Sequence, residues 1–342
     1  MENNRTELSE LGEFGLIDHL SKGIELHQGS SLLGIGDDAA VIDTNGQALV
    51  MTTDMLCEGV HFNLMYTPLK HLGYKAIVVN LSDVYAMNAT PTQVVVGLGM
   101  SNRFSAEAVN ELYEGIKLAC AKYDVDLVGG DVSTSQTGLV ISVTATGLVN
   151  ESEVVKRSGG KKGDLLVLSG DTGGAYFGLQ ILEREKEVFK AAPTAQPDLE
   201  GVEYLLERQL KPEARRDVVE LLAQLEVLPT AMIDVSDGVA SEALHIAKAS
   251  NCSVKIYEDK LPLHPQTISA AETFNIDATT PALNGGEDYE LLFTLAQEDF
   301  DKIKNAPEWT IIGHLGDIKD GSELVTKSGQ TVPLEAQGWK HV

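Results

Sequence analysis

Cysteine is scarce in this sequence. Among 342 residues only Cys57, Cys120 and Cys252 occur, far apart and without a Cys-x-x-Cys pair. This distribution excludes a disulfide framework and a cysteine-based structural zinc site. We therefore expect reduced thiols and a cytoplasmic protein.

Basic residues and long apolar runs are also few. The chain has 26 lysines and arginines against 51 aspartates and glutamates, a net charge of −25. Such a charge repels a nucleic-acid backbone and an anionic lipid surface. No uncharged apolar run reaches the length of a membrane span, and residues 1–13 lack the apolar centre of a secretory signal. We expect neither a nucleic-acid partner nor a membrane partner.

Several common active-site motifs are missing. The sequence has no Gly-x-x-x-x-Gly-Lys-Ser/Thr loop, no Gly-x-Ser-x-Gly elbow and no His-Glu-x-x-His pair. Gly34, Gly36 and Ala39 satisfy the relaxed dinucleotide pattern, but Asp37 and Asp38 would lie where a pyrophosphate must approach. A nucleotide site of the P-loop or Rossmann type is therefore disfavoured.

What remains is an ordinary globular composition, 43% hydrophobic and 23% charged, in a chain long enough for two domains. Apolar runs of strand length alternate with helical patterns, which predicts an α/β (α+β) fold. After Ser105, a candidate N-cap, the spacing of Val109, Leu112 and Ile116 predicts a helix. The predicted strands of this half are 48–54, 93–100, 126–131 and 138–149.

A polar stretch with several glycines, 151–164, predicts a domain connection. We place the boundary near residue 152, giving an N-terminal domain 1–152 and a C-terminal domain 153–342. Beyond it, the patterns predict strands at 164–171, 230–237, 252–258, 288–295 and 309–313, and helices near 173–186, 213–226 and up to residue 250. Residues 190–201, rich in alanine and proline, are predicted to be irregular.

Aspartate and glycine meet repeatedly beside apolar runs, and we interpret these junctions as strand ends. Each one alone is an ordinary turn or helix cap. Together they would gather carboxylates, which repel one another unless a cation offsets their charge. Hard divalent cations such as Mg²⁺ take oxygen ligands and bridge to phosphates, so the pattern predicts several Mg²⁺ ions and a bound nucleotide. The six segments are GIGDDAAV (34–41), TTD (52–54), NLSDVYAM (80–87), VGGDVS (128–133), IDVSDG (233–238) and NGGEDYEL (284–291).

The densest positive segment contains Lys156, Arg157, Lys161 and Lys162. It could hold the far side of a polyphosphate, with Arg157 as the better candidate because its guanidinium binds phosphate in a bidentate manner. For the lysines a solvated loop is an equally good interpretation.

Two further side chains could face a ligand. His61 follows Asp54 by seven residues, near enough to face the same cleft, although a lone histidine is more often structural. Trp339 lies near the end of the chain, where a tryptophan usually packs the tail down but could also stack on a flat heteroaromatic ring.

The motifs taken together resemble a known family. GIGDDAAV, TTDMLCEGVHF, AIVVNLSDVYAMNATP, VGGDVS, KRSGG, MIDVSDGVASEALHIAKAS and NGGEDYELLFT occur in the order and spacing of the bacterial thiamine-monophosphate kinases. This family lies in the superfamily of aminoimidazole ribonucleotide synthetase. The resemblance implies a two-domain fold whose N-terminal domain forms a sheet or barrel across a homodimer. It also implies Mg²⁺-dependent, in-line transfer of the ATP γ-phosphoryl group to thiamine monophosphate, giving thiamine diphosphate and ADP.

Roles carry over to matching positions of this chain only as the resemblance implies them. The implied magnesium ligands are Asp38, Thr52, Thr53, Asp54, Asp83, Asp131 and Asp234, with Asp237 for an outer ion. The implied nucleotide contacts are Gly130, Asp131, Arg157 and Ser236, and the implied thiamine-phosphate contacts are His61, Glu287 and Trp339. Catalysis would rest on Asp83, Asp131 and Asp234. The sequence departs from the family at Asn88, where glycine is common, and at Gln209, where histidine is common.

Two alternative functions stay open. One is another ATP-dependent enzyme of the superfamily with a different acceptor. The absence of cysteine before Cys57 argues against selenophosphate synthesis, and the cysteine-free end GWKHV argues against the carbamoyl-accepting hydrogenase maturation relative. The other is a non-catalytic acidic protein that binds divalent cations. For the kinase, no general base is required, because a phosphate monoester is largely ionised at neutral pH, its second pKa being about 6.

Overall fold

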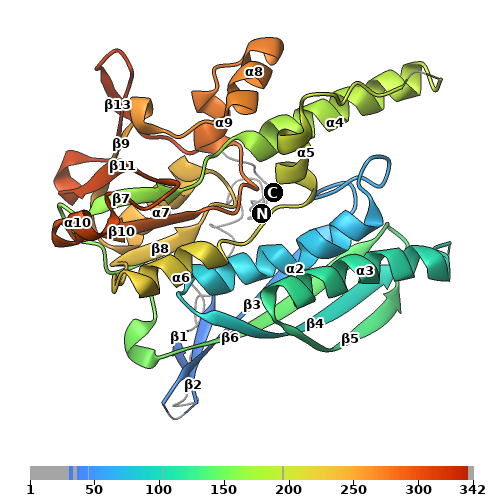
Figure 1. Ribbon diagram of the computed structural model, residues 1–342, viewed down its shortest axis with the longest axis horizontal. Helices are drawn as coiled ribbons and strands as arrows, with labels where there is room; N and C mark the ends of the chain where they lie inside the picture. Colours follow the sequence, from blue (N-terminus) through green and yellow to red (C-terminus); the bar gives the residue numbers. More distant parts are fainter. Residues whose placement is uncertain (1–30, 34–36, 45, 102, 195, 338–342) are drawn as a thin grey trace, which may run out of the picture.

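The computed structural model describes residues 31–33, 37–44, 46–101, 103–194 and 196–337. These residues form two β-sheets with helices packed between and around them (Figure 1). The first sheet has the order β1-β2-β3-β6-β4-β5, and every neighbouring pair is antiparallel except β4 and β5. Its strands are β1 (Ser31–Leu33), β2 (Ala40–Asp43), β3 (Ala48–Cys57), β4 (Thr90–Met100), β5 (Asp126–Thr134) and β6 (Val140–Val149).

The second sheet has the order β13-β12-β9-β11-β7-β10-β8, with only the β9–β12 pair parallel. A one-turn helix, η1 (Glu151–Glu153), lies in the connection between the sheets, where the sequence predicts the domain boundary. That boundary stays a prediction. The strands of the second sheet are β7 (Leu165–Ser169), β8 (Ala231–Asp234), β9 (Ser253–Tyr257), β10 (Leu291–Leu295), β11 (Trp309–Gly316), β12 (Glu323–Val325) and β13 (Thr331–Pro333).

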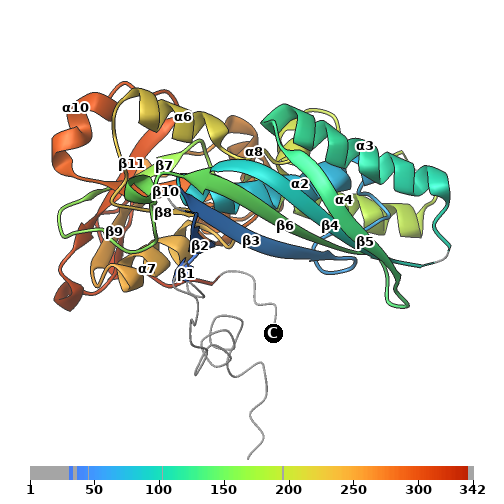
Figure 2. The same ribbon diagram turned by 90° about the horizontal axis from the view of Figure 1, so that it is seen from below.

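Helices cover one face of the first sheet and leave the other face open. α2 (Leu69–Ala86) and α3 (Ala106–Tyr123) pack on the covered face, and Figure 2 shows the opposite face without a helix over it. The remaining helices belong to the second half of the chain. They are α4 (Gly174–Ala191), α5 (Glu203–Leu210), α6 (Arg216–Gln224), α7 (Val239–Ala249), α8 (Pro265–Phe274), α9 (Thr279–Asn284) and α10 (Phe300–Ile303), with the short turns η2 (Glu258–Lys260), η3 (Gln297–Asp299) and η4 (Ile318–Asp320).

α2 is the centre of the molecule. It packs against β3, β4 and β6 of the first sheet, and also against α3, α5 and β8. Ile77, Leu81 and Val84 are fully buried, and burial extends around the helix rather than along one stripe. A helix that is apolar on all sides is one that is covered on all sides. This helix therefore joins the two halves of the chain.

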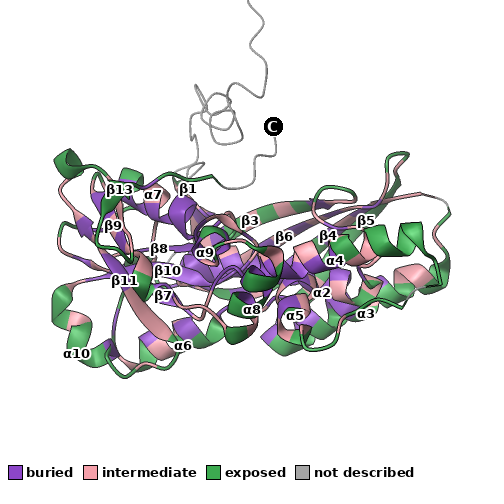
Figure 3. Cartoon of the chain, turned by 90° about the horizontal axis from the view of Figure 1, so that it is seen from above, coloured by how far each residue is buried: buried purple, intermediate pink, exposed green. Residues whose placement is uncertain are grey.

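The hydrophobic core confirms that connection. The largest cluster of buried residues joins Ile77 and Ile116 to Val218 of α6 and Phe293 of β10. The other face of the second sheet packs against α7 in a separate cluster, and strands β7, β8 and β10 are buried along their length (Figure 3). Both faces are covered at β7, β8 and β10, which explains why these three strands are mostly apolar.

The predicted two-domain α/β (α+β) class is confirmed. The helix after Ser105 is also confirmed, and the Ser105 hydroxyl accepts a hydrogen bond from the amide of Ala108 at 3.2 Å. In the second half, α5, α8 and α9 lie in segments for which the sequence predicted no helix. Among the described residues, no helix is long and apolar enough to span a bilayer.

The interpretation of the aspartate junctions as strand ends is wrong in part. Residues 80–87 belong to the last turns of α2 and its C-cap, and residues 52–54 lie in the middle of β3. Residues 128–133 likewise lie within β5. Because α2 is buried on all sides, its sequence lacks the apolar spacing of an amphipathic helix. Its apolar residues are therefore interpreted as a strand.

The contact between α2 and α3 depends on two glycines. A Cβ at Gly115 would lie 1.8 Å from the carbonyl oxygen of Lys70, and one at Gly73 would lie 2.0 Å from that of Leu112. No Cβ tolerates such distances, so the helices approach this closely only with glycine at both positions.

We expect Gly115→Ala to destabilise the protein by about 2 kcal/mol or more, because separating the helices opens the packed core. Thermal unfolding measures the effect. Lys117→Ala, at an exposed position on the same helix, is the control and should change the melting temperature little. Equal melting temperatures for wild type and Gly115→Ala would contradict the close approach.

Candidate active site

Three aspartates from distant parts of the sequence meet where the two halves of the chain join. Asp38 precedes β2, Asp83 lies in the last turn of α2, and Asp234 ends β8. One carboxylate oxygen from each lies within 4.8 Å of the others. Asp38 and Asp234 are buried and Asp83 is half-buried. The sequence predicted all three as metal ligands, and the structure brings them together.

Hydroxyl groups fix the orientation of two of these carboxylates. Thr52 of β3 donates a hydrogen bond to Asp83 Oδ2 at 2.8 Å, and Ser82 of α2 donates to Asp234 Oδ2 at 2.7 Å. Ser82 and Asp83 are neighbours on one helix, so one turn of α2 contacts both partners. These bonds hold the carboxylates in place before any ligand arrives.

Asp54 joins the same acidic group from β3. Its backbone amide donates to Asn80 Oδ1 of α2 at 3.0 Å, and its charge raises the pKa of Asp83 and Asp234. Thr52 and Asp54 are two residues apart on a strand, so both side chains point to the face covered by α2. The segment TTD therefore contributes two of its three side chains to the acidic group.

The carboxylates are poorly compensated by the protein itself. Burial and the charges of Asp54, Asp234 and Asp38 raise the pKa of Asp83 well above its usual value. Burial and the charge of Asp38 raise the pKa of Asp234 to about 7, although the Ser82 hydrogen bond acts in the opposite direction. Buried like charges favour protonation unless a cation is bound. Their oxygen-rich environment fits a hard divalent cation.

Arg157 supplies the positive charge closest to this group. Its Nε and one terminal nitrogen bind both oxygens of Asp38, at 3.0 and 2.6 Å. Its backbone amide also lies 3.2 Å from both carboxylate oxygens of Asp37. Of the predicted positive segment, Arg157 is thus the member at the site, whereas Lys161 and Lys162 are exposed and Lys162 pairs with Asp317 at 3.5 Å.

The loop after β8 carries two more predicted residues, Ser236 and Asp237. The backbone amide of Asp237 donates to Glu242 Oε1 at 2.9 Å, and Glu242 is a buried residue of α7. Burial, followed by the charge of Asp237, raises the pKa of Glu242 well above its usual value. Ser236 is exposed, and its carbonyl accepts a hydrogen bond from the amide of Glu287 at 2.6 Å. A predicted nucleotide contact and a predicted acceptor contact are therefore adjacent.

Glu287 lies on a constrained loop and is held by both halves of the chain. Its backbone φ is 58°, in the left-handed region that non-glycine residues seldom adopt. Lys75 Nζ of α2 lies 3.2 Å from one carboxylate oxygen, and Gln209 Nε2 of α5 donates to the other at 2.9 Å. Lys75 is almost fully buried, and it also donates to the carbonyl of Gln209 at 3.0 Å.

His61 lies in the loop between β3 and α2. Its Nδ1 accepts a hydrogen bond from the backbone amide of Cys57 at 3.0 Å. In the neutral ring, this bond assigns the proton to Nε2, which can then act as a donor.

Three predicted residues lie elsewhere in the fold. The Thr53 hydroxyl points away from α2 and donates to the carbonyl of Val143 at 2.9 Å. Gly130 is level with Asp54 across β6 and β4, three strands away, which is roughly 14 Å at about 4.8 Å per strand. Asp131 is exposed on the edge strand β5. Within a single chain these three do not join the acidic group, and Trp339 lies outside the described residues.

Sequence reasoning missed five residues that shape the site. Asn80 and Ser82 stand inside the quoted segment NLSDVYAM, but only its aspartate was interpreted. Asp37 was considered only as an obstacle to pyrophosphate. No sequence pattern around Lys75 marks it as a site residue, since a single lysine in an apolar run is normally interpreted as a surface position. Glu242 is likewise interpreted as an ordinary helix residue.

Comparisons with known proteins identify the class. Residues 36–149 match the family described as "AIR synthase related protein, N-terminal domain", and residues 161–325 match "AIR synthase related protein, C-terminal domain". Together the two matches cover most of the chain, so it belongs to the AIR synthase related family.

Within that class the chain belongs to the thiamine-monophosphate kinase family. It is 36% identical over 335 residues to the thiamine-monophosphate kinase of Aquifex aeolicus, covering 98% of this chain and 99% of the relative. It is 33% identical to that of Bacillus subtilis, covering 97% and 99%. The solved structure "AaThiL complexed with AMPPCP and TMP" matches with a TM-score of 0.84 and 34% identity, over 99% of this chain and 100% of that one.

The raised pKa of Asp234 predicts a pH dependence of stability without metal. With a folded pKa of about 7 against an ordinary 3.8, Asp234 binds more protons in the folded state between these values. The free energy of unfolding should therefore fall as the pH rises through this interval, by about 1.4 kcal/mol for each pKa unit at most. Thermal unfolding in a chelator at about pH 5 and about pH 8 measures it.

Asp234→Asn removes this titration and should flatten the dependence relative to wild type. Mg²⁺ should raise the melting temperature of wild type most at the higher pH, where the carboxylates are ionised. An identical pH dependence in wild type and Asp234→Asn would contradict the assignment.

Proposed function

We propose that this chain is a thiamine-monophosphate kinase that transfers the ATP γ-phosphoryl group directly to the phosphate of thiamine monophosphate. The products are thiamine diphosphate and ADP. The observation that carries the proposal is the convergence of Asp38, Asp83 and Asp234 beside Arg157, in a chain whose relatives over nearly their full length are named for this reaction. A solved relative is described with AMPPCP, an ATP analogue, and TMP.

The donor set fits Mg²⁺. Three carboxylates within 4.8 Å, two of them buried, are oxygen ligands whose mutual repulsion a divalent cation relieves. Asp38, Asp83 and Asp234 would hold the ions, with Asp54 and Thr52 beside them. Bound Mg²⁺ would neutralise charge on the phosphate oxygens of the nucleotide.

The reaction requires no covalent intermediate with a protein side chain. The acceptor phosphate is largely ionised at neutral pH, so it can attack the γ-phosphorus without a general base. The side chains need only position two anionic groups in line and offset their charge. Arg157 lies where it can do so, because its guanidinium is fixed by Asp38 at the edge of the acidic group.

The acceptor would extend toward Glu287. This carboxylate is about a quarter exposed (27%) and is oriented by Lys75 and Gln209, so it offers a fixed negative charge to a cationic heterocycle. His61 Nε2 would offer a hydrogen-bond donor to the acceptor, because Nδ1 is already occupied by the Cys57 amide. We keep Trp339 as a proposed contact, because the resemblance implies it. We also place the reaction in the cytoplasm, which the three free cysteines support.

A direct assay tests the proposal. Purified protein with thiamine monophosphate, radiolabelled ATP and Mg²⁺ should yield labelled thiamine diphosphate, and excess chelator should abolish the product. Unphosphorylated thiamine serves as the control acceptor and should give none. An ATP analogue that binds equally well in chelator would contradict the metal-dependent site.

Asp83→Asn should lower kcat by at least a hundredfold while leaving the protein folded, because it removes one of the three converging negative charges proposed to hold Mg²⁺, a loss of about 3 kcal/mol or more. Circular dichroism and steady-state kinetics measure both properties. Asp301→Asn, at an exposed position of α10 where the carboxylate pairs with Lys304, is the matched control. Near-normal turnover in folded Asp83→Asn would overturn the assignment.

We also propose that the protein is a homodimer through the open face of the first sheet. This face carries exposed apolar residues on two strands, Met51 (39%) and Met55 (55%) of β3 and Val95 (39%) of β4. β5 also leaves one edge unpaired, which is a template for strand pairing (Figure 2). Gly130 and Asp131 would then lie under or beside the interface instead of in open solvent.

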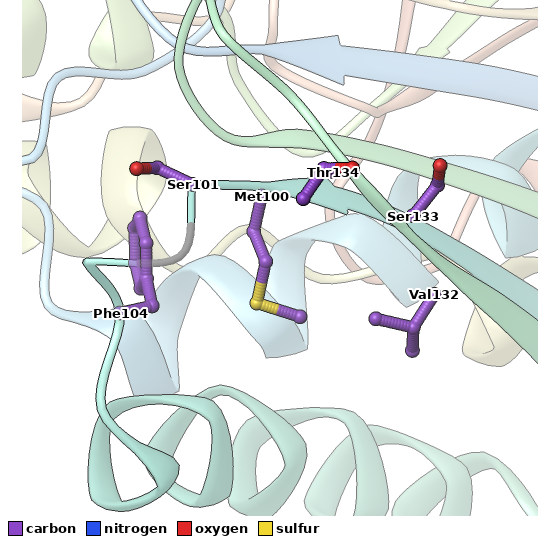
Figure 4. Close-up of a pocket in the computed structure, with 6 residues that line it drawn as sticks. All are labelled: Met100, Ser101, Phe104, Val132, Ser133 and Thr134. Carbon is purple, nitrogen blue, oxygen red and sulfur yellow. The ribbon is translucent and has the colours of Figure 1, made fainter.

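A hollow at the ends of β4 and β5 lies beside the free edge of β5, on the side of the sheet that α3 covers. It is lined by Met100, Phe104 and Val132, with Ser101, Ser133 and Thr134 at its polar side (Figure 4). Apolar side chains around a shallow hollow suit the packing of a second copy.

Met55→Lys should convert the dimer to a monomer, because it places a charge on the apolar open face of the first sheet. Sedimentation velocity measures the mass of wild type and variant. Val188→Lys, at an exposed apolar position on α4 away from the sheet, is the control and should stay dimeric. A wild-type protein that sediments as a monomer at all concentrations would contradict the dimer.

A further inference from the structure

A second contact between the halves of the chain lies in the loop that carries His61. Tyr66, five residues after His61, donates its hydroxyl hydrogen to Glu183 Oε1 of α4 at 2.8 Å. Lys186, one turn further along α4, pairs with the other oxygen of Glu183, and its ammonium lies 5.8 Å from the centre of the Tyr66 ring. We call Tyr66, Glu183 and Lys186 the clasp. In Figure 1 the loop between β3 and α2 lies beside α4 and α5.

Backbone hydrogen bonds make the loop compact, and they link Tyr66 of the clasp to the segment that carries His61. The amide of Gly59 donates to the carbonyl of Phe62 at 2.8 Å, and the amide of Tyr66 donates to that of Asn63 at 3.1 Å. Phe62 is buried, which anchors the middle of the loop. A displacement of Tyr66 is therefore transmitted to His61.

The carboxylate proposed to receive the acceptor, that of Glu287, lies within electrostatic range of the Tyr66 hydroxyl. Burial and the hydrogen bond to Glu183 raise the pKa of Tyr66, and the charge of Glu287 raises it further. Glu287 thus acts electrostatically on the Tyr66 hydroxyl although it belongs to a different loop. Tyr66 thus belongs to the His61 loop, contacts α4 and lies within the electrostatic range of Glu287.

We propose that Tyr66, through Glu183 and Lys186, is a positioning residue for the acceptor: it fixes the His61 loop against α4 and so forms one wall of the site that takes the cationic heterocycle. The proposal rests on the kinase function proposed above and goes beyond it, because neither the motifs nor the resemblance assigns these three residues. The nucleotide, held at the acidic group, does not depend on the clasp.

The test compares Tyr66→Phe and Glu183→Ala with wild type. Tyr66→Phe deletes only the hydroxyl, and losing a hydrogen bond to a carboxylate should raise KM for thiamine monophosphate about tenfold. KM for ATP should change less than about twofold and the melting temperature little, since the bond is partly exposed. Because both variants break one contact, their effects should not add in the double variant.

Glu187→Ala is the matched control. Glu187 lies one turn further along α4 and pairs with Lys190 in the same i, i+3 arrangement, but at an exposed position. It should leave both KM values unchanged. Equal rises of the two KM values, additive effects of Tyr66→Phe and Glu183→Ala, or an equal effect of Glu187→Ala would each overturn the proposal.

Hydrogen exchange separates this proposal from the kinase function. Amides of residues 59–67 should exchange faster in Tyr66→Phe than in wild type, whatever substrate the enzyme uses. Failure of wild type to phosphorylate thiamine monophosphate would remove the kinase function, whereas unchanged exchange in Tyr66→Phe would remove the clasp.

Discussion

The repulsion among three carboxylates, two buried and one half-buried, is the constraint on which the site depends. Asp38, Asp83 and Asp234 lie within 4.8 Å of one another, with Arg157 as their one arginine partner among the described contacts. Two unit charges at 4 Å repel by about 4 kcal/mol at an effective dielectric constant of 20, so a fold that gathers them loses stability unless protons or cations bind. Such a loss of local stability is common at functional sites, and here it favours the binding of a cation.

The hydrophobic burial of α2 offsets the free-energy cost of bringing these charges together. Its apolar residues bury surface against both sheets, and each fully buried aliphatic side chain contributes about 1.5 to 3 kcal/mol. The same helix presents Asp83 and Ser82 to the acidic group and Lys75 to Glu287. Because Lys75 and Asp83 are eight residues apart, they are separated by about 12 Å along the helix. One rigid element therefore sets the distance between the acidic group and Glu287.

The sequence predicted the chemistry better than the geometry. Asp38, Asp83 and Asp234 could be proposed because aspartates recur in apolar surroundings, and the structure brings them together. The location of Asp83 on a helix could not be predicted, because a helix buried on all sides lacks the periodicity by which helices are recognised. Lys75 and Glu183 could not be found at all. Their roles arise from partners more than a hundred residues away, and no local pattern encodes such pairs.

The alternation of side chains along β3 explains why one motif serves two surfaces. In the segment TTD, Thr52 and Asp54 point toward α2 and the acidic group, so Thr53 must point to the open face of the sheet. Gly130 and Asp131 lie on β5 at the far edge of the same sheet, and Gly130 approaches β4 so closely that a Cβ would lie 2.1 Å from the Val96 carbonyl oxygen. A strand can supply metal ligands on one face only by turning its intervening residues to the other. Met51, Thr53 and Met55 therefore lie on the open face of the sheet, which is the surface proposed above for a second copy.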